Sequence, residues 1–293
     1  MVKTMYKIGV DIGGTKTSFG LFKDGFLLKK VTIQSPKNKK DEMIEKISAI
    51  ISEISLGIPR NQINGVGIGI PGELNRITGI VYFMPNLPIW KNIPIKKLLE
   101  KKLKLRVEIE NDANCSALAE ARLRRIKNLI YLGIGTGLGG GIIMDGKIYH
   151  GKETAGELGH MIINFNGPKC SCGSNGCLES YVSARGAATI AKRVCRQKMT
   201  SLEIYTKAAA GDKKAIECYN EFGKYLGIGI SNISNIFDPK KIIIGGGLSN
   251  ASRFFLNSAL KEMKSRTLMK NLPKVEISNL KDSGIIGASL LID

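Results

Sequence analysis

The sequence predicts an α/β protein with two lobes. The chain has 293 residues, of which 43% are apolar, and this is enough for about two domains. Apolar runs of strand and helix length alternate along the chain, as in α/β proteins. Two segments, Asp11 to Gly25 and Gly133 to Gly146, share an apolar strand, a Gly/Thr turn, a second strand and a closing Asp-Gly pair. This repetition predicts that one structural unit is duplicated.

The first lobe is predicted to contain residues 1–115. It begins with a β-meander from Tyr6 to Gln34 around a Lys23-Asp24-Gly25 turn. In Asp41 to Gly57 the apolar residues have helical spacing, and Gly57 suits a C-terminal cap. The elements expected after this helix are strands at Ile63 to Ile70 and Arg106 to Glu110, with a proline-rich loop and a short basic helix near Ile95 to Lys104 between them.

The second lobe is predicted to contain residues 116–280. It begins with a second meander, in which a strand at Leu129 to Ile134 and a strand at Ile142 to Met144 enclose a glycine-rich turn. The elements expected later are a long helix from Asp212 to about Asn235, a buried strand at Lys241 to Ile244, another helix, and a final short helix from Ser283.

Composition indicates a cytoplasmic protein. The N-terminus carries no export signal, and no apolar stretch approaches the roughly 18 residues of a membrane span. Six cysteines are too few for a disulfide framework in a chain this long, so we expect a reducing compartment. The net charge of +19 comes mainly from lysines on helical surfaces, which we interpret as solvated faces rather than as a nucleic-acid site.

The first glycine turn has the composition of a phosphate site. Its glycines, Gly13 and Gly14, leave backbone amides unshielded by side chains. Thr15 and Lys16 add a hydroxyl and a cation, and Asp11 could hold Mg²⁺ through water. A plain hairpin turn is the alternative interpretation, but it does not account for the four residue types together.

Two further glycine clusters extend the predicted ATP site. Gly135, Thr136 and Gly137 begin a stretch that matches G-x-G-x-x-G, but a β-branched run and an Asp-Gly turn follow it, where a dinucleotide fold needs a helix. A Walker A loop is absent from the sequence as well. The third cluster, Gly245, Gly246 and Gly247, follows a buried strand and predicts an adenosine pocket, with a tight strand-to-helix turn as the alternative.

Asp112 is the candidate catalytic base. The alternating strand that ends at Glu110 delivers Asn111 and Asp112 to the start of a helix. A helix cap would also favour these residue types. In the functional interpretation, Asp112 accepts a proton from a sugar hydroxyl during phosphoryl transfer.

A His/Cys cluster predicts a structural Zn²⁺ site. His160, Cys170, Cys172 and Cys177 have the spacing H-x9-C-x-C-x4-C, and four protein ligands leave no position for a reactive water. The other three cysteines are expected to be core thiols.

The predicted metal site would also order a sugar site. Glu157 and Glu179 lie close to the metal ligands in sequence and could accept hydrogen bonds from vicinal hydroxyls, while a zinc-bound His160 keeps its second ring nitrogen as a donor. Ordinary surface acids are the alternative for both glutamates. His150 has no such support, and we interpret it as incidental.

Taken in order, these motifs resemble the ROK family of sugar kinases and sugar-responsive repressors. The resemblance covers nearly the whole chain. Its motifs are DIGGTK at 11–16, GIGIPG at 67–72, PNLPIW at 85–90, ENDAN at 110–114, GIGTGLGGG at 133–141, GELGHM at 156–161, CSCGSNGCLE at 170–179 and IIIGGGLS at 242–249.

The resemblance implies an actin/hexokinase-like (ribonuclease H-like) fold with an interlobe cleft, and a C-terminal helix at about 281–293 that packs on the first lobe. It also implies a role for Asp112 as the base and a homodimer or homotetramer. The sugar-binding residues that it implies are Asn86, Asn111, Asp112, Glu157, His160 and Glu179.

The predicted reaction is transfer of the γ-phosphoryl group of ATP to the 6-hydroxyl of glucose. Kinases for N-acetylglucosamine, N-acetylmannosamine or fructose remain alternatives, because Ile89 stands where glucokinase-like members often have Gly. A non-catalytic sugar sensor is an alternative of another class. Only ten residues precede Asp11, whereas the repressor branch carries a helix-turn-helix there, so we expect a kinase.

Overall fold

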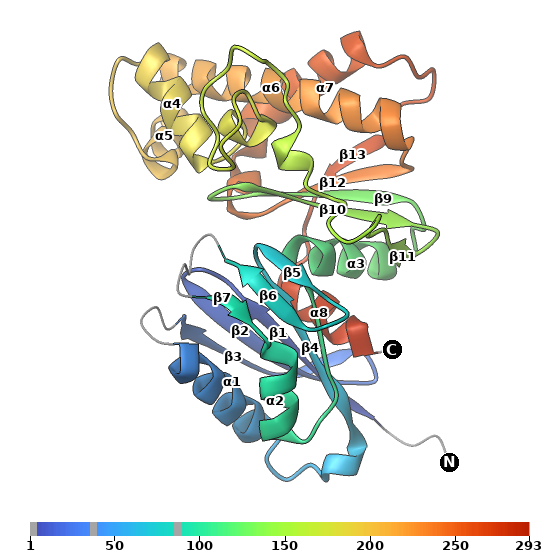
Figure 1. Cartoon of the computed structure of the whole chain (residues 1–293). Coiled ribbons are helices and arrows are strands. Elements are labelled where there is room, and N and C mark those ends of the chain that lie inside the picture. The colour runs from blue at the N-terminus through green and yellow to red at the C-terminus, as the bar shows by residue number, and fades with distance from the viewer. Residues whose placement is uncertain (1–4, 36–39, 85–89, 293) are drawn as a thin grey trace. The chain divides into compact units, whose positions relative to one another are not determined.

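The computed structural model describes residues 5–35, 40–84 and 90–292 (Figure 1). Their packing divides them into two units. Residues up to 125, 147–155 and those from 280 form the first unit, and 126–146 and 156–279 form the second. The first unit therefore continues past Cys115, where the sequence placed its end. The reason is that Cys115 lies inside one unbroken helix, α3 (Asp112–Arg124), which packs against the C-terminal helix.

The first unit is built on a five-stranded mixed sheet. Its strand order is β3-β2-β1-β4-β8. Strands β1, β2 and β3 form the predicted antiparallel meander, and β4 and β8 extend the sheet in parallel with β1. The strands are β1 (Tyr6–Ile12), β2 (Lys16–Lys23), β3 (Phe26–Gln34), β4 (Ile63–Ile70) and β8 (Val107–Asn111). A small antiparallel sheet is formed by β5 (Glu73–Asn75), β6 (Ile80–Phe83) and β7 (Lys91–Ile93).

The α-helices in the described part of the first unit are α1 (Lys40–Ile54), α2 (Ile95–Leu103), α3 and α8 (Ser283–Ser289). The C-terminal helix α8, labelled in Figure 1, contacts β1, β2, β4 and α3. The described residues from 280 onward are thus grouped with the first unit. The approach needs glycine in β4, because a Cβ on Gly67 would lie 1.7 Å from the carbonyl oxygen of Ala288.

A second five-stranded sheet, of which β9, β10, β12 and β13 belong to the second unit, repeats this topology. Its strand order is β11-β10-β9-β12-β13, with β9 and β10 antiparallel and β9, β12 and β13 parallel. The strands are β9 (Leu129–Ile134), β10 (Leu138–Met144), β11 (Lys147–Ile148), β12 (Lys241–Gly245) and β13 (Lys274–Ile277). The equivalent strand orders confirm the predicted duplication.

The helices of the second unit are α4 (Ala184–Val194), α5 (Ser201–Ala209), α6 (Lys213–Phe237) and α7 (Ser252–Arg266). Helix α6 was predicted nearly to its ends, whereas α4 and α5 were not predicted. The core joins the isoleucines of β12 to the aromatic side chains of α6 and α7, such as Phe222 and Phe255. Among the described residues, no helix is both long enough and apolar enough to cross a membrane.

Candidate functional site

The first glycine turn is a tight hairpin between β1 and β2. The Gly13 amide donates to the Lys16 carbonyl at 2.9 Å, and the Ser35 hydroxyl donates to the Gly13 carbonyl at 2.6 Å. A Cβ on Gly13 would lie 2.8 Å from that Lys16 oxygen, so the turn needs glycine here. The side chains of Thr15 and Lys16 are exposed, and Gly14 lies beside them. A hydroxyl and a cation are therefore available to an anion at this turn.

Asp11, at the end of β1, lies among other carboxylates. Burial raises its pKa to about 7, and repulsion from Asp112 and Asp282 contributes as well. Asp282 is itself paired with Lys30, whose Nζ lies 2.6 Å from its Oδ1. A divalent cation near Asp11 would favour its ionised form, so the donor set fits Mg²⁺ held through water.

Asp112 is the first residue of α3, directly after β8. Asn111 caps the helix, because its side-chain oxygen accepts from the amides of Ala113 at 2.9 Å and Asn114 at 3.3 Å. The Asp112 carboxylate also accepts from Ala113, at 2.8 Å. The capping role considered for Asn111 is therefore real. The cap uses only the side-chain oxygen of Asn111, so the side-chain NH₂ group stays available to donate a hydrogen bond to a ligand.

Glu110 and His150 form a buried pair that the sequence analysis did not identify. Oε2 of Glu110 lies 2.6 Å from Nε2 of His150, and the glutamate is 4% exposed. His150 was interpreted as incidental because the predicted metal site gives it no support. No spacing pattern connects it to Glu110, which lies 40 residues earlier. The only signal in the sequence was an acidic residue at the buried end of a strand, which requires a partner.

The second glycine turn connects β9 to β10 and is braced by Glu179. Its Gly135 amide donates to the Gly137 carbonyl at 2.9 Å. Oε2 of Glu179 accepts from the Leu138 amide at 2.9 Å and would lie 2.4 Å from a Cβ on Gly137. Thr136 is exposed at the tip. Glu179 thus stabilises the turn through its hydrogen bond with the Leu138 amide, a contact that the sequence did not predict.

The third glycine cluster follows β12. Gly246 has a φ of 82°, and a Cβ there would lie 2.4 Å from the Ile134 carbonyl. A Cβ on Gly245 would lie 2.3 Å from the hydroxyl oxygen of Tyr131. These two glycines are therefore required by packing, as the tight-turn interpretation supposed. A Cβ on Gly247 would meet nothing within 4 Å, so the backbone is open to a ligand at this position, next to the second glycine turn.

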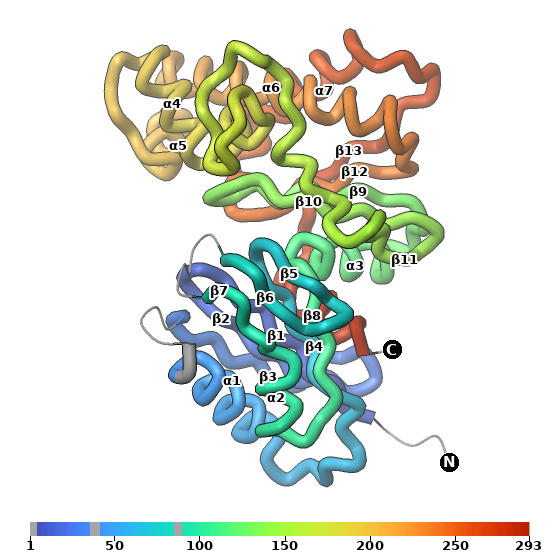
Figure 2. The backbone as a smooth tube through the Cα atoms, viewed as in Figure 1, coloured from blue at the N-terminus to red at the C-terminus, as the bar shows by residue number. Residues whose placement is uncertain are grey.

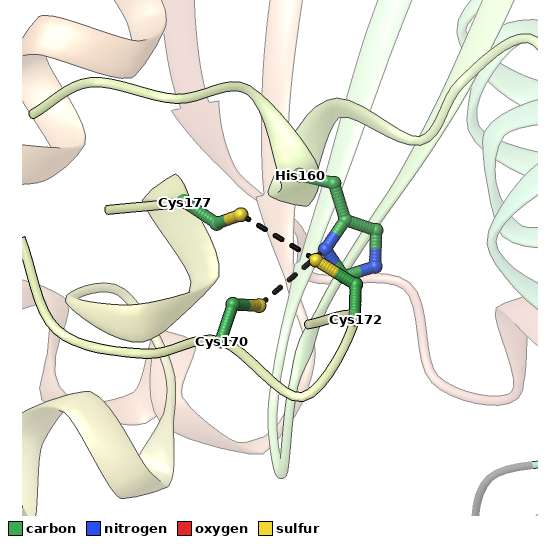
Figure 3. Close-up of side chains that lie close together, drawn as sticks. All are labelled: His160, Cys170, Cys172 and Cys177. Atoms are coloured by element: carbon green, nitrogen blue, oxygen red, sulfur yellow. Dashed lines mark hydrogen bonds between the residues drawn. The ribbon is translucent and has the colours of Figure 1, made fainter. Parts of the chain in front are cut away.

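The four metal-ligand candidates converge within the second unit. The ligand atoms of His160, Cys170, Cys172 and Cys177 all lie within 4.8 Å of one another (Figure 3). Nδ1 of His160 is 3.6 Å from Sγ of Cys170, and the sulfurs of Cys172 and Cys177 are 3.7 Å apart. These separations match the edges of a tetrahedron with Zn–S bonds of about 2.3 Å. The donor set therefore fits zinc.

The chain around this cluster is ordered by short backbone contacts. The Cys170 amide donates to the Ser174 carbonyl at 2.8 Å, which closes the turn that carries two of the cysteines. Gly173 and Gly176 have φ values of 95° and 71°, which favour glycine. Both glycines therefore let the backbone turn tightly between the cysteines.

Glu157 and Glu179 both lie beside the Cys/His cluster. Nε2 of His160 is 3.8 Å from Oε2 of Glu157, so the ring presents Nδ1 to the thiols and Nε2 to the carboxylate. Oε1 of Glu179 accepts from the Ser171 hydroxyl at 3.0 Å. Within the second unit, the structure therefore brings together Glu157, His160, Glu179 and the second glycine turn. Asn86 and Ile89 lie outside the described residues.

The comparisons with known proteins agree with these motifs. A model of the ROK family matches residues 7–293. The chain belongs to the ROK family. Its resemblance to the family and its actin/hexokinase-like fold, both predicted from the sequence, are thereby confirmed.

Curated ROK relatives include kinases and a repressor. The chain is 33% identical to a glucokinase of Thermotoga maritima over 97% of this chain and 96% of that protein. It is 33% identical to an N-acetyl-D-glucosamine kinase of Vibrio cholerae over 97% of this chain and 98% of that one. It is also 36% identical to a xylose repressor of Caldicellulosiruptor bescii, over 76% of this chain and 60% of the repressor.

A solved ROK structure provides a full-length match. A ROK family glucokinase from Streptomyces griseus, in complex with glucose and AMPPNP, superposes with a TM-score of 0.84 at 30% identity. The match covers 98% of both chains.

Proposed function

We propose that this protein transfers the γ-phosphoryl group of ATP to the 6-hydroxyl of glucose. The observation that carries the proposal is the full-length likeness to a ROK glucokinase solved with glucose and AMPPNP. Family membership and the match to glucokinases along the whole chain make it an ATP-dependent sugar kinase, as predicted. The identity of the sugar and of the hydroxyl is the proposed part.

In this proposal Asp112 is the general base. The sugar oxygen attacks the γ-phosphorus, the bond from that phosphorus to the bridging oxygen of ADP breaks, and the hydroxyl proton passes to the Asp112 carboxylate. Its place at the first turn of α3 supports the role, because helix amides orient the carboxylate and the helix dipole favours its anionic form. A base of this kind contributes about 10²- to 10⁴-fold to the rate.

Binding of the sugar is assigned to Asn86, Asn111, Glu157, His160 and Glu179. Their chemistry is suited to a polyol, because carboxylates accept from vicinal hydroxyls and amide or imidazole nitrogens donate to them. Glu179 has a second part in this proposal. Since it accepts from Leu138 and Ser171, it would link the second glycine turn to the Cys/His loop.

ATP is assigned to the three glycine turns and Lys16. Exposed Thr15, Lys16 and Thr136 and the open face of Gly247 support this assignment. When bound, Mg²⁺ would neutralise charge that develops on the phosphates, and Asp11 would hold its water. A structural zinc ion would be held by His160, Cys170, Cys172 and Cys177, where it would orient the imidazole.

N-acetylglucosamine is the leading alternative substrate, because a kinase for that sugar matches this chain as fully as a glucokinase does. Activities toward N-acetylmannosamine and fructose are further alternatives, and the same assay tests them. A coupled assay of ADP release should therefore be run with glucose, fructose, mannose and both N-acetylhexosamines, with ATP as donor and polyphosphate in a parallel series. We expect glucose to give the highest kcat/KM, whereas an N-acetylhexosamine that exceeds it would reassign the substrate.

A second candidate function is a sugar sensor without catalysis, and the match to a xylose repressor is the observation that supports it. It predicts sugar binding by calorimetry without release of ADP from any sugar in the panel. The same assay therefore separates the two classes. We also propose that the protein is cytoplasmic and forms a homodimer or homotetramer, and light scattering during size-exclusion chromatography would test the oligomeric state.

A further inference from the structure

We propose that His150 is a positioning residue for phosphoryl transfer. Through Glu110 it fixes the end of β8 and the first turn of α3, where Asn111 and Asp112 lie. This inference rests on the proposed function, because it takes Asp112 as the base. It assigns a role to a side chain that neither the family motifs nor the predicted metal site uses.

Glu110 is a buried carboxylate with several donors around it. Its Oε1 accepts from the Asn111 amide at 2.8 Å and from Nδ2 of Asn114 at 3.0 Å. Its Oε2 faces Nε2 of His150 at 2.6 Å. One oxygen of Glu110 thus holds both the backbone amide of Asn111 and the side chain of Asn114. These two residues flank Asp112 in the sequence. Glu110 is well placed to set the geometry of this turn.

His150 reaches Glu110 from a distant part of the chain. It follows β11, in the segment 147–155 that packs with the first unit, although the chain before and after this segment belongs to the second. Strand β11 contacts α3, and the two elements lie side by side in Figure 2. The segment is held on the first unit at a second point as well, where Nδ2 of Asn75 donates to Glu153 at 3.0 Å.

Removal of His150 would leave one oxygen of a buried carboxylate without its donor. Such an oxygen must find water or another donor, and either change turns the Glu110 side chain away from its present partners. The backbone amide of Asn111 and the side-chain amide of Asn114 would then lose the acceptor that fixes them. Since a displacement of about 1 Å in a reacting group can cost about 100-fold in rate, the effect should appear in catalysis.

The test compares three variants in the full-length protein. His150→Leu removes the donor, and His150→Gln keeps an N–H donor on a side chain of similar reach. Lys152→Ala is the matched control, because Lys152 is exposed in the same segment. For each protein we would measure kcat and KM for the preferred hexose, the Kd for AMPPNP by calorimetry, and the melting temperature.

We expect His150→Leu to lower kcat by about 10- to 100-fold, with the Kd for AMPPNP changed less than about threefold. His150→Gln should recover most of the loss, and Lys152→Ala should match the wild type. Wild-type kcat in the Leu variant would overturn the inference. So would a Gln variant no better than Leu with an equal fall in melting temperature, since that pattern marks a structural role only.

The two proposals fail in different ways. If the wild type phosphorylates a hexose and His150→Leu does so equally well, only the positioning role is wrong. If the wild type has no turnover but binds a sugar, the kinase proposal is wrong, and the sugar Kd takes the place of kcat in the same comparison. If the wild type neither turns over nor binds any sugar of the panel, both proposals are contradicted.

Discussion

The ionised form of Asp11 lowers the stability of the fold. Its pKa of about 7 lies above the ordinary value of 3.8, chiefly because of burial and then because of Asp112 and Asp282. When the folded-state pKa is the higher one, the fold favours the protonated carboxyl. This stabilising contribution is complete below about pH 4 and is lost as the pH rises through about 7.

We therefore expect Asp11→Asn to stabilise the protein selectively at high pH in the absence of nucleotide. At pH 8 its free energy of unfolding in urea should exceed that of the wild type by up to about 4 kcal/mol, which is the size of a three-unit shift. At pH 4 the two should agree closely. Asp24→Asn is the matched control, because Asp24 is an exposed turn residue. Equal stability of Asp11→Asn and the wild type at both pH values would refute the buried-carboxyl account.

Gly137 tests whether Glu179 braces the second glycine turn. A Cβ at Gly137 would displace the carboxylate that accepts from the Leu138 amide. Gly137→Ala should therefore lower the free energy of unfolding by about 1 to 3 kcal/mol, the usual cost of an unsatisfied donor. In Gly135→Ala the added methyl group would meet nothing within 4 Å, so its stability should change little. Similar melting temperatures for the two variants would argue against the brace.

At the scale of elements, we propose that a metal ion holds the Cys/His loop together. Exposed Cys172 and buried Cys170 and Cys177 are all free thiols. Three thiols this close to an imidazole are typical of a zinc ligand set, in which the bound metal contributes folding energy.

Purified protein should accordingly contain about one zinc per chain by elemental analysis. Removal of the metal with a chelator, or the substitution Cys172→Ser, should lower the melting temperature and weaken sugar binding, because His160 loses its orientation. The substitution Cys195→Ser should keep the metal, since Cys195 lies outside the loop. Metal-free protein with full stability and full sugar affinity would show that the loop is ordered without zinc.

Local sequence patterns predicted some elements better than others. The hairpins around the first two glycine turns were predictable, because apolar strands flank residues that demand a turn. Helices α4 and α5 were not, since no pattern in the sequence singled them out before Asp212. The predicted lobe boundary near Cys115 rests on the strand-to-helix pattern, which marks where α3 begins but not which neighbours this helix packs against.

At the scale of the whole molecule, the duplicated sheet explains why the site could be predicted in pieces. Each copy ends its first strand in a glycine turn, so two similar patterns in the sequence become two similar hairpins. Contacts that cross long stretches of sequence were not predictable. The Glu110–His150 pair joins β8 to a segment 40 residues later, and only the folded chain brings them together.

We propose that Asp112 accepts the proton of a hexose hydroxyl as the γ-phosphoryl group leaves ATP. This proposal is tested most directly by the rate of glucose-dependent ADP release from Asp112→Asn beside the wild type, with the glucose Kd of each measured by calorimetry. The account predicts that the variant loses about 10²- to 10⁴-fold in kcat while its glucose Kd stays within about threefold. A variant that turns over at the wild-type rate would contradict it.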